Sequence, residues 1–208
     1  MWGVISVSAT DRHWTGAISA DWNIAANWNP AGVPQNGDNL IFDSSSRTTM
    51  TNSIANLTVN NLTFSQSADF FLFGQAVTIN GLILDPNGTG TLTVNCPLIA
   101  QPGAQISSST IATSPDSTAK LYLNQPVTIN SGMLRLIISD TIGSSESSGF
   151  IYCQSSFSGG GDISVETYGN GSLGKIEFDA PLGNGFTGRY SLKQRPHLLI
   201  STAQPGQC

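Results

Sequence analysis

Charge is scarce in this 208-residue sequence. Only 10% of its residues are Asp, Glu, Lys or Arg, against roughly 25% in ordinary soluble domains. With 8 Lys and Arg, 13 Asp and Glu and a formal net charge of −5, the chain lacks a basic surface suited to nucleic acid or to an anionic membrane. We therefore expect no nucleic acid among its partners.

Cysteine and histidine are also rare. Cys96, Cys153 and Cys208 are too few for a disulfide framework, and their spacing forms no metal motif. Cys96 and Cys153 can meet only if they lie on stacked strands, and isolated thiols more often pack as small hydrophobes. His13 and His197 lie at opposite ends of the chain. We expect neither a metal site nor a cofactor.

Long apolar runs and helical periodicity are missing as well. No apolar stretch approaches the ~20 residues of a membrane-spanning helix, so no transmembrane segment is expected. No window keeps an apolar stripe at positions i, i+3, i+4 and i+7 over three turns. A single helical turn is predicted only at "DWNIAANWN", Asp21–Asn29.

Short segments of alternating apolar and polar residues dominate what is present. A hydrophobic content of 39% supports a real core, and the many Thr, Val and Ile residues favour pleated strands. Strands are predicted at Asn39–Phe42, Leu57–Phe64, Phe70–Phe73, Val77–Leu84, Thr91–Val94, Leu121–Leu123, Val127–Ile129, Met133–Ile138, Phe150–Cys153, Ile163–Val165, Lys175–Phe178, Tyr190–Leu192 and His197–Ile200.

One short phrase recurs within these strands: an apolar, a polar and an apolar residue, then Asn. The alternation places two apolar side chains on one face. Asn is expected to close each strand because it tolerates a left-handed backbone and can bond its own main chain. The copies are "LTVNN" at Leu57, "VTING" at Val77, "LTVNC" at Leu92, "LYLNQ" at Leu121 and "VTINS" at Val127.

This pattern predicts an all-β parallel β-solenoid rather than a hairpin sandwich. Asn-Gly pairs occur without matched long strands on both sides, which argues against hairpins. Because charges stacked about 4.8 Å apart would repel, a solenoid also explains the charge-poor surface. We expect about 20 residues per coil. The predicted organisation is a Trp-rich capping segment over residues 1–37, a solenoid over 38–200 and a tail over 201–208.

Two segments carry a resemblance to a known family. Gly159–Ile200 combines a Gly-rich entry, an Ile-x-Val strand, Gly-x-Gly and an Asn-Gly-Phe-Thr-Gly turn, and resembles one autotransporter-associated β-strand repeat. "WTGAISADWNIAANWNPAGVPQNGDNLIFD", Trp14–Asp43, resembles the segment that often opens such repeat regions in secreted bacterial proteins. The resemblance implies a passenger-type parallel β-helix that is secreted or displayed on the bacterial cell surface.

Three tryptophans, Trp14, Trp22 and Trp28, are the most conspicuous candidate site. One reading is a carbohydrate-binding platform, because aromatic faces stack on the apolar faces of sugars. The other reading is a cap that covers the open strand edges of the first coil. The area that each indole buries favours the cap.

Carboxylates offer a second candidate. Glu177 and Asp179 are two residues apart and so point to the same face of a strand. A glycosidase pair needs carboxyl groups roughly 5–9.5 Å apart, a distance that such neighbours could meet. Lys175 on the same face would offset the negative charge of that pair. We therefore favour a solvated outer face with surface ion pairs over a catalytic pair. Asp162 follows three glycines, as in a calcium-binding nonapeptide repeat, but this motif is not repeated in the chain.

The function favoured by these patterns is a non-enzymatic, extracellular structural solenoid of the adhesin or passenger type. The alternative is a carbohydrate-binding or carbohydrate-active β-helix that acts on a polysaccharide or a cell-surface ligand. Leu198, Leu199 and Ile200 form the predicted association edge, because an apolar strand there would end the stack. That edge would meet a second molecule or further repeats.

Overall fold

In the computed structural model, the chain is all-β with almost no helix. The structure describes residues 9–43, 47–64, 68–84, 90–110, 118–140, 148–168, 174–179, 185–193 and 199–202. Within these ranges lie 21 strands and a single short 3₁₀ helix, η1 (Ala25–Asn27). This helix falls inside the helical turn predicted at Asp21–Asn29.

The strands form three sheets, which we name A, B and C. Sheet A contains, in spatial order, β2 (Trp28–Asn29), β1 (Asp11–Trp14), β3 (Asn39–Phe42), β6 (Asn61–Phe64), β9 (Leu82–Leu84), β12 (Gln105–Thr110), β15 (Met133–Asp140), β18 (Asp162–Tyr168) and β20 (Tyr190–Lys193). Sheet B contains β4 (Thr49–Asn52), β7 (Phe70–Gly74), β10 (Thr91–Asn95), β13 (Thr118–Leu123), β16 (Ser148–Cys153), β19 (Lys175–Phe178) and β21 (Leu199–Thr202). Sheet C contains β5 (Leu57–Val59), β8 (Val77–Ile79), β11 (Leu98–Ala100), β14 (Val127–Ile129) and β17 (Phe157–Ser158).

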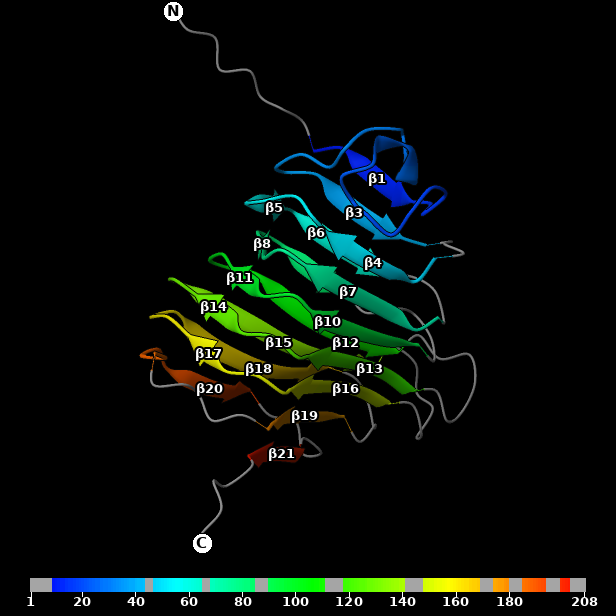
Figure 1. Ribbon diagram of the computed structural model, residues 1–208. Coiled ribbons are helices and arrows are strands. Elements are labelled where there is room, and N and C mark those ends of the chain that lie inside the picture. Colours follow the sequence, from blue (N-terminus) through cyan, green and yellow to red (C-terminus); the bar gives the residue numbers. More distant parts are fainter. Residues whose placement is uncertain are drawn as a thin grey trace, which may run out of the picture.

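Pairing within the sheets is parallel with one exception. From β3 to β19 the chain adds one strand to sheet A, one to sheet B and one to sheet C in turn, and no strand of sheet C is assigned between β18 and β20. Among the described strands, the sole antiparallel pair is β1 with β2. Figure 1 shows the strands following one another from β1 (blue) at one end to β21 (red) at the other. This arrangement excludes an antiparallel sandwich.

The number of residues between paired positions varies along the chain. Leu57 pairs with Val77, whereas Val127 pairs with Phe157, which is a longer step along the chain. The expected step of about 20 residues fits the first of these pairs and not the second. Strands of sheets A and B lengthen from four residues in β3 and β4 to eight in β15 and six in β16. The longer steps accommodate these longer strands and the segments that connect them.

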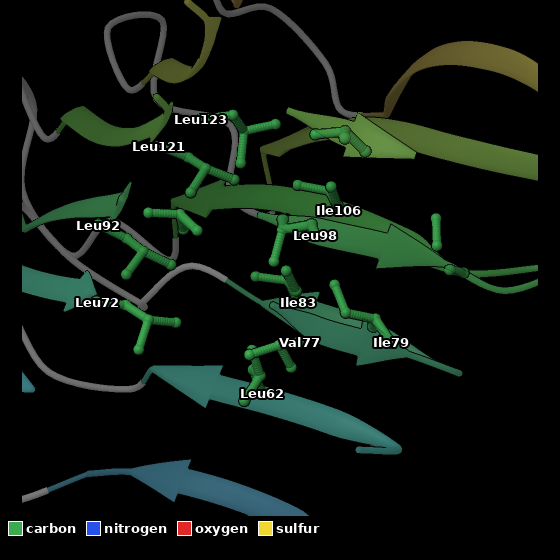
Figure 2. Packing of buried hydrophobic residues seen from close by; sticks show 14 of the residues in the cluster. Leu62, Leu72, Val77, Ile79, Ile83, Leu92, Leu98, Ile106, Leu121 and Leu123 are labelled. Atoms are coloured by element: carbon green, nitrogen blue, oxygen red, sulfur yellow. The ribbon is translucent and has the colours of Figure 1, made fainter. Parts of the chain in front are cut away.

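Apolar residues in register build the core. In sheet A the paired positions Leu40, Leu62, Ile83, Ile106, Leu136 and Val165 are all fully buried. Figure 2 shows side chains of all three sheets gathered in one apolar cluster, including Leu62, Leu92 and Leu98. Burying one such side chain contributes about 1.5–3 kcal/mol. The core therefore runs along the stack of strands.

The asparagines that close the repeated phrase behave differently from the prediction. Among the described residues other than glycine, a positive φ occurs at Asn56 alone, which lies outside the phrase. Instead, Asn124 Nδ2 donates to Asn95 Oδ1 at 3.0 Å, and Asn60 Nδ2 donates to the Gly37 carbonyl at 2.7 Å. The predicted left-handed conformation was wrong, because stacked amides can satisfy one another between neighbouring strands.

Cys96 and Cys153 are buried and form no disulfide bond. Burial raises the pKa of the Cys96 thiol to about 12 and also raises the pKa of Cys153. Both residues therefore pack as small hydrophobes rather than as reactive thiolates. Cys208 and His197 lie outside the described residues. In the part of the chain that the structure describes, no helix is long and apolar enough to cross a membrane.

Candidate functional site

The three tryptophans lie inside the molecule at the end of the core formed by β1 and β3. Trp14, Trp22 and Trp28 have exposed fractions of 1%, 0% and 2%. Trp22 stacks on Phe42 with ring centroids 5.7 Å apart, and Phe42 stacks in turn on Phe64 at 4.5 Å. The indoles therefore cover the first apolar layer. At this degree of burial no indole face is open for a sugar to stack on.

The same N-terminal segment bonds to the first strand of every sheet. In sheet A, β2 pairs with the outer edge of β1. In sheet B, the Thr51 N–H of β4 donates to the Ala20 carbonyl at 2.8 Å. In sheet C, the Gly37 N–H donates to the Thr58 carbonyl of β5 at 2.8 Å. Main-chain groups at the beginning of all three sheets therefore find partners within the chain itself.

Asn27 holds this segment together. Its buried side-chain amide donates to Ser19 Oγ at 3.0 Å and to the Asp21 carbonyl at 2.7 Å. Its Oδ1 accepts from the Ile18 and Ser19 N–H groups at 2.8 and 3.0 Å. Four hydrogen bonds satisfy the amide completely, so the loop between β1 and β2 has a defined shape.

The opposite end of the stack is built differently. Within the described chain, β20 pairs only with β18 and β21 pairs only with β19. Leu192 on β20 pairs with Val165 and continues the buried apolar row of sheet A, yet it is 47% exposed. Of the predicted association edge, Leu199 and Ile200 lie in β21, and Leu198 falls outside the described residues.

A network of charged and polar side chains centres on Glu166 of β18. Arg135 Nε donates to Oε1 at 3.0 Å and its Nη2 donates to Oε2, while Ser164, Tyr168 and Lys193 also donate to the carboxylate. The Glu166 side chain is only 2% exposed. Hydrogen bonds from Arg135, then from the other donors, lower its pKa despite burial. The carboxylate therefore stays ionised and is a poor proton donor.

Of the three carboxylates that the sequence indicated, Glu177 and Asp162 have bonding partners. Lys175 Nζ lies 2.6 Å from Glu177 Oε2, and the same contact raises the pKa of Lys175. Asp162 Oδ1 accepts from the Arg189 N–H at 2.7 Å, so it serves a main-chain contact. Asp179 is exposed. Among the described residues, no three His, Cys, Asp or Glu side chains gather where they would hold a metal ion.

Sheet B carries an outward-facing group of aromatic residues that the sequence analysis missed. We name Phe71, Phe73, Tyr122, Phe150 and Tyr152 the aromatic face. Phe71 and Phe73 are 37% and 40% exposed, and the other three are half-buried. Alternation could have indicated them. Each of these aromatic residues stands at an outward position of its strand, where a polar residue is usual.

The rings of β13 and β16 share nearly one orientation. Tyr122 and Tyr152 lie 4.7 Å apart with planes 11° from parallel, and Phe150 and Tyr152 lie 6.1 Å apart with planes 8° from parallel. Burial, and then the neighbouring Tyr122, raises the pKa of Tyr152. Its phenol is therefore a neutral hydrogen-bond donor at physiological pH.

A shallow depression of about 600 Å³ lies between the N-terminal segment and the turn from β4 to β5. Amide side chains and small apolar residues line it, among them Asn23, Gln35, Pro34 and Ile54. Gln35 Nε2 donates to the carbonyls of Val33 and Pro34, so its amide nitrogen bonds within the loop. None of the described residues that line this depression is charged.

The fold defines an all-β protein of stacked parallel strands. No protein-family model matches the chain, and comparisons with curated proteins and with solved structures find no similar protein. The resemblance to autotransporter-associated repeats stays a prediction from the residues quoted above.

Proposed function

We propose that the three sheets wind as one parallel β-solenoid and that the chain is a non-catalytic scaffold segment of the adhesin or passenger type. The regular A, B, C order of strands supports the winding. In this proposal residues 1–37 form the cap of the solenoid. The resemblance of Trp14–Asp43 and Gly159–Ile200 to segments of secreted bacterial proteins supports a secreted or cell-surface location.

The observation that carries the proposal is the asymmetry between the two ends. At the β1 end, three buried indoles cover the core and the N-terminal segment bonds to all three sheets. At the β21 end, a core-row residue, Leu192, is exposed and the last strands of sheets A and B have an unused edge among the described residues. An unused edge is a template for another strand. The next unit of the same fold would satisfy it.

The cap also limits how two copies meet. A head-to-tail contact would need the β1 end of one molecule to accept strands, and there the outer sides of β1, β4 and β5 already bond to the N-terminal segment, which leaves only the two-residue strand β2 as an edge among the described strands. Two copies would therefore join through their β21 ends. Such a contact is two-fold and closes as a dimer instead of growing into a filament. Further repeats of a longer chain would occupy the same end.

A non-catalytic role fits the state of the acidic groups. Glu166 is held ionised by Arg135, and Glu177 is paired with Lys175. The pKa of Glu166 is lowered, whereas a general acid needs a raised pKa. These groups act instead as contacts within and between neighbouring strands.

Sedimentation velocity at increasing protein concentration tests the proposal. We expect the wild type to form dimers, and we expect Leu199→Lys to suppress them because a charge on an edge strand opposes pairing. The matched control is Ile18→Lys, which places the same charge at an exposed apolar residue of the capped end. A wild type that stays monomeric at high concentration, or equal loss of dimers in both variants, would contradict the proposal.

A further inference from the structure

We propose that the aromatic face of sheet B is a binding site for a neutral, linear polysaccharide. The site lies on the side of the stack, away from both ends, so it is independent of the association described above. Its five aromatic residues come from β7, β13 and β16. An exposed group of large apolar side chains on a monomer usually marks an interaction site.

Register places aromatic residues of β7, β13 and β16 in one row along the stack, interrupted by a threonine of β10. Phe71 pairs with Thr93, Thr93 with Tyr122, and Tyr122 with Tyr152. These four positions form one row at the strand spacing of about 4.8 Å. A linear polymer with a short regular repeat can present similar groups to successive strands of such a row. Aromatic rings contact the apolar faces of sugars, and this contact needs little side-chain ordering when the rings are already packed together.

Hydroxyl-bearing side chains lie among the aromatic rings. β10 crosses the face between the Phe71–Phe73 pair and Tyr122, and its outward residues Thr91 and Thr93 are half-buried. Threonine hydroxyls both donate and accept hydrogen bonds, and the phenols of Tyr122 and Tyr152 add two further polar ends. Alternating apolar and hydroxyl-bearing side chains suit a ligand that is amphipathic along its whole length.

The charges beside the face favour a neutral ligand. Lys120 lies on the same strand as Tyr122, while Lys175, Glu177 and Asp179 belong to β19 and the residue that follows it. Lys175 is already bonded to Glu177 and stands 6.0 Å from the centre of the Tyr152 ring. Asp69, whose carboxylate accepts from the Thr91 N–H, adds a third negative group to the two positive ones, so an anionic polymer gains no net attraction here.

Affinity gel electrophoresis tests the site with three neutral polymers, hydroxyethylcellulose, xylan and mannan, and with polygalacturonate as the anionic probe. We expect at least one neutral polymer to retard the wild type and the monomeric Leu199→Lys variant equally. Removing two rings in Tyr122→Ala/Tyr152→Ala should weaken binding roughly tenfold or more, because two stacking contacts are lost. The control Met133→Ala removes an exposed apolar side chain of sheet A and should bind like the wild type.

A second variant guards against loss of folding. Phe71→Ser/Phe73→Ser alters only exposed rings, so it should keep the wild-type circular dichroism and still lose retardation. Three results would overturn the proposal: no retardation by any neutral polymer, retardation by polygalacturonate alone, or full binding by both aromatic variants. Loss of self-association in the aromatic variants without any glycan binding would also overturn it and would make the face a contact between copies.

Discussion

At the scale of single residues, the Trp22 side chain stabilises the fold almost entirely by burying apolar surface. It is fully buried and stacks on Phe42. Its indole nitrogen has no hydrogen-bond partner among the described residues, whereas Trp28 donates its indole N–H to the Trp22 carbonyl at 2.9 Å. The Trp22 ring therefore contributes to stability through apolar contacts. A ring that orients a polar ligand would instead use its N–H as a donor.

Replacing Trp22 tests its role in closing the core. Trp22→Ala should lower the free energy of unfolding by about 3–5 kcal/mol, as for other large buried aromatics. Trp22→Phe should cost less than half as much, because it keeps a ring on Phe42 and loses an N–H that bonds to nothing described. Urea denaturation followed by circular dichroism measures both changes. Equal losses in the two variants would contradict a role for the ring contact with Phe42.

Glu166 is the residue at which stability couples to pH. The ionised carboxylate accepts from Arg135, Ser164, Tyr168 and Lys193. Its pKa in the folded protein lies below the ordinary value of 4.5. The stabilisation is therefore fully present above the unfolded-state pKa, and it is lost as the pH falls towards the folded-state pKa.

The variant Glu166→Gln should show this dependence directly. At pH 7 it should be less stable than the wild type by about 1–3 kcal/mol, because charge-assisted hydrogen bonds to Arg135 are weakened. The difference between the two proteins should shrink as the pH is lowered below 4.5. Glu177→Gln provides the control, since a surface ion pair contributes less than about 1 kcal/mol. A constant difference from pH 3 to pH 7 would contradict this account.

At the scale of elements, the end of β7 depends on Gly74. Its φ is +109°, and a Cβ atom at this position would overlap the Asn52 carbonyl oxygen of the neighbouring strand β4. Both the backbone conformation and the close approach of β4 therefore require glycine. Gly103 has a similar φ of +87° with no atom within 4 Å of the place that a Cβ would take.

Alanine substitutions at these two glycines separate the cost of a left-handed backbone from the cost of steric overlap with a neighbouring strand. Gly103→Ala should cost about 1 kcal/mol, the usual penalty of a side chain in a left-handed conformation. Gly74→Ala should cost more than about 2 kcal/mol, because β7 must also move away from β4. Thermal unfolding of both variants gives the comparison. If the two costs are the same, the tight strand contact at Gly74 does not matter for stability.

Several strands were predictable from alternation alone, and others were not. Asn39–Phe42, Val127–Ile129 and Lys175–Phe178 occur at their predicted bounds. β12, with the sequence QISSST, was missed because Ser107 and Ser108 are polar and yet buried. Leu57–Phe64 was predicted as one strand and forms two, β5 and β6, in different sheets. A polar residue can be buried when neighbouring strands satisfy it, which alternation cannot reveal.

At the scale of the whole molecule, the two ends of the stack differ in how well their apolar core is covered. The N-terminal segment covers its end because Trp14, Trp22 and Trp28 come together with Asn27, whose amide fixes the loop. At the other end β21 reaches Thr202, beyond the predicted boundary at residue 200. Leu192 stays exposed although its row is buried elsewhere. Such an open end is what the proposed association would use.

The sequence by itself determined the class of structure: period-two alternation and the lack of helical stripes require strands, and low charge suits strands stacked at short spacing. It also indicated Trp14, Trp22 and Trp28 as a group. Only the tertiary structure decided the register between strands far apart in the chain, as between Leu57 and Val77 or Val127 and Phe157. That register decides which outward side chains become neighbours, and so it alone created the aromatic face and the Glu166 network. Alternation shows which face a side chain occupies, but its neighbour on the next strand depends on the length of chain between them.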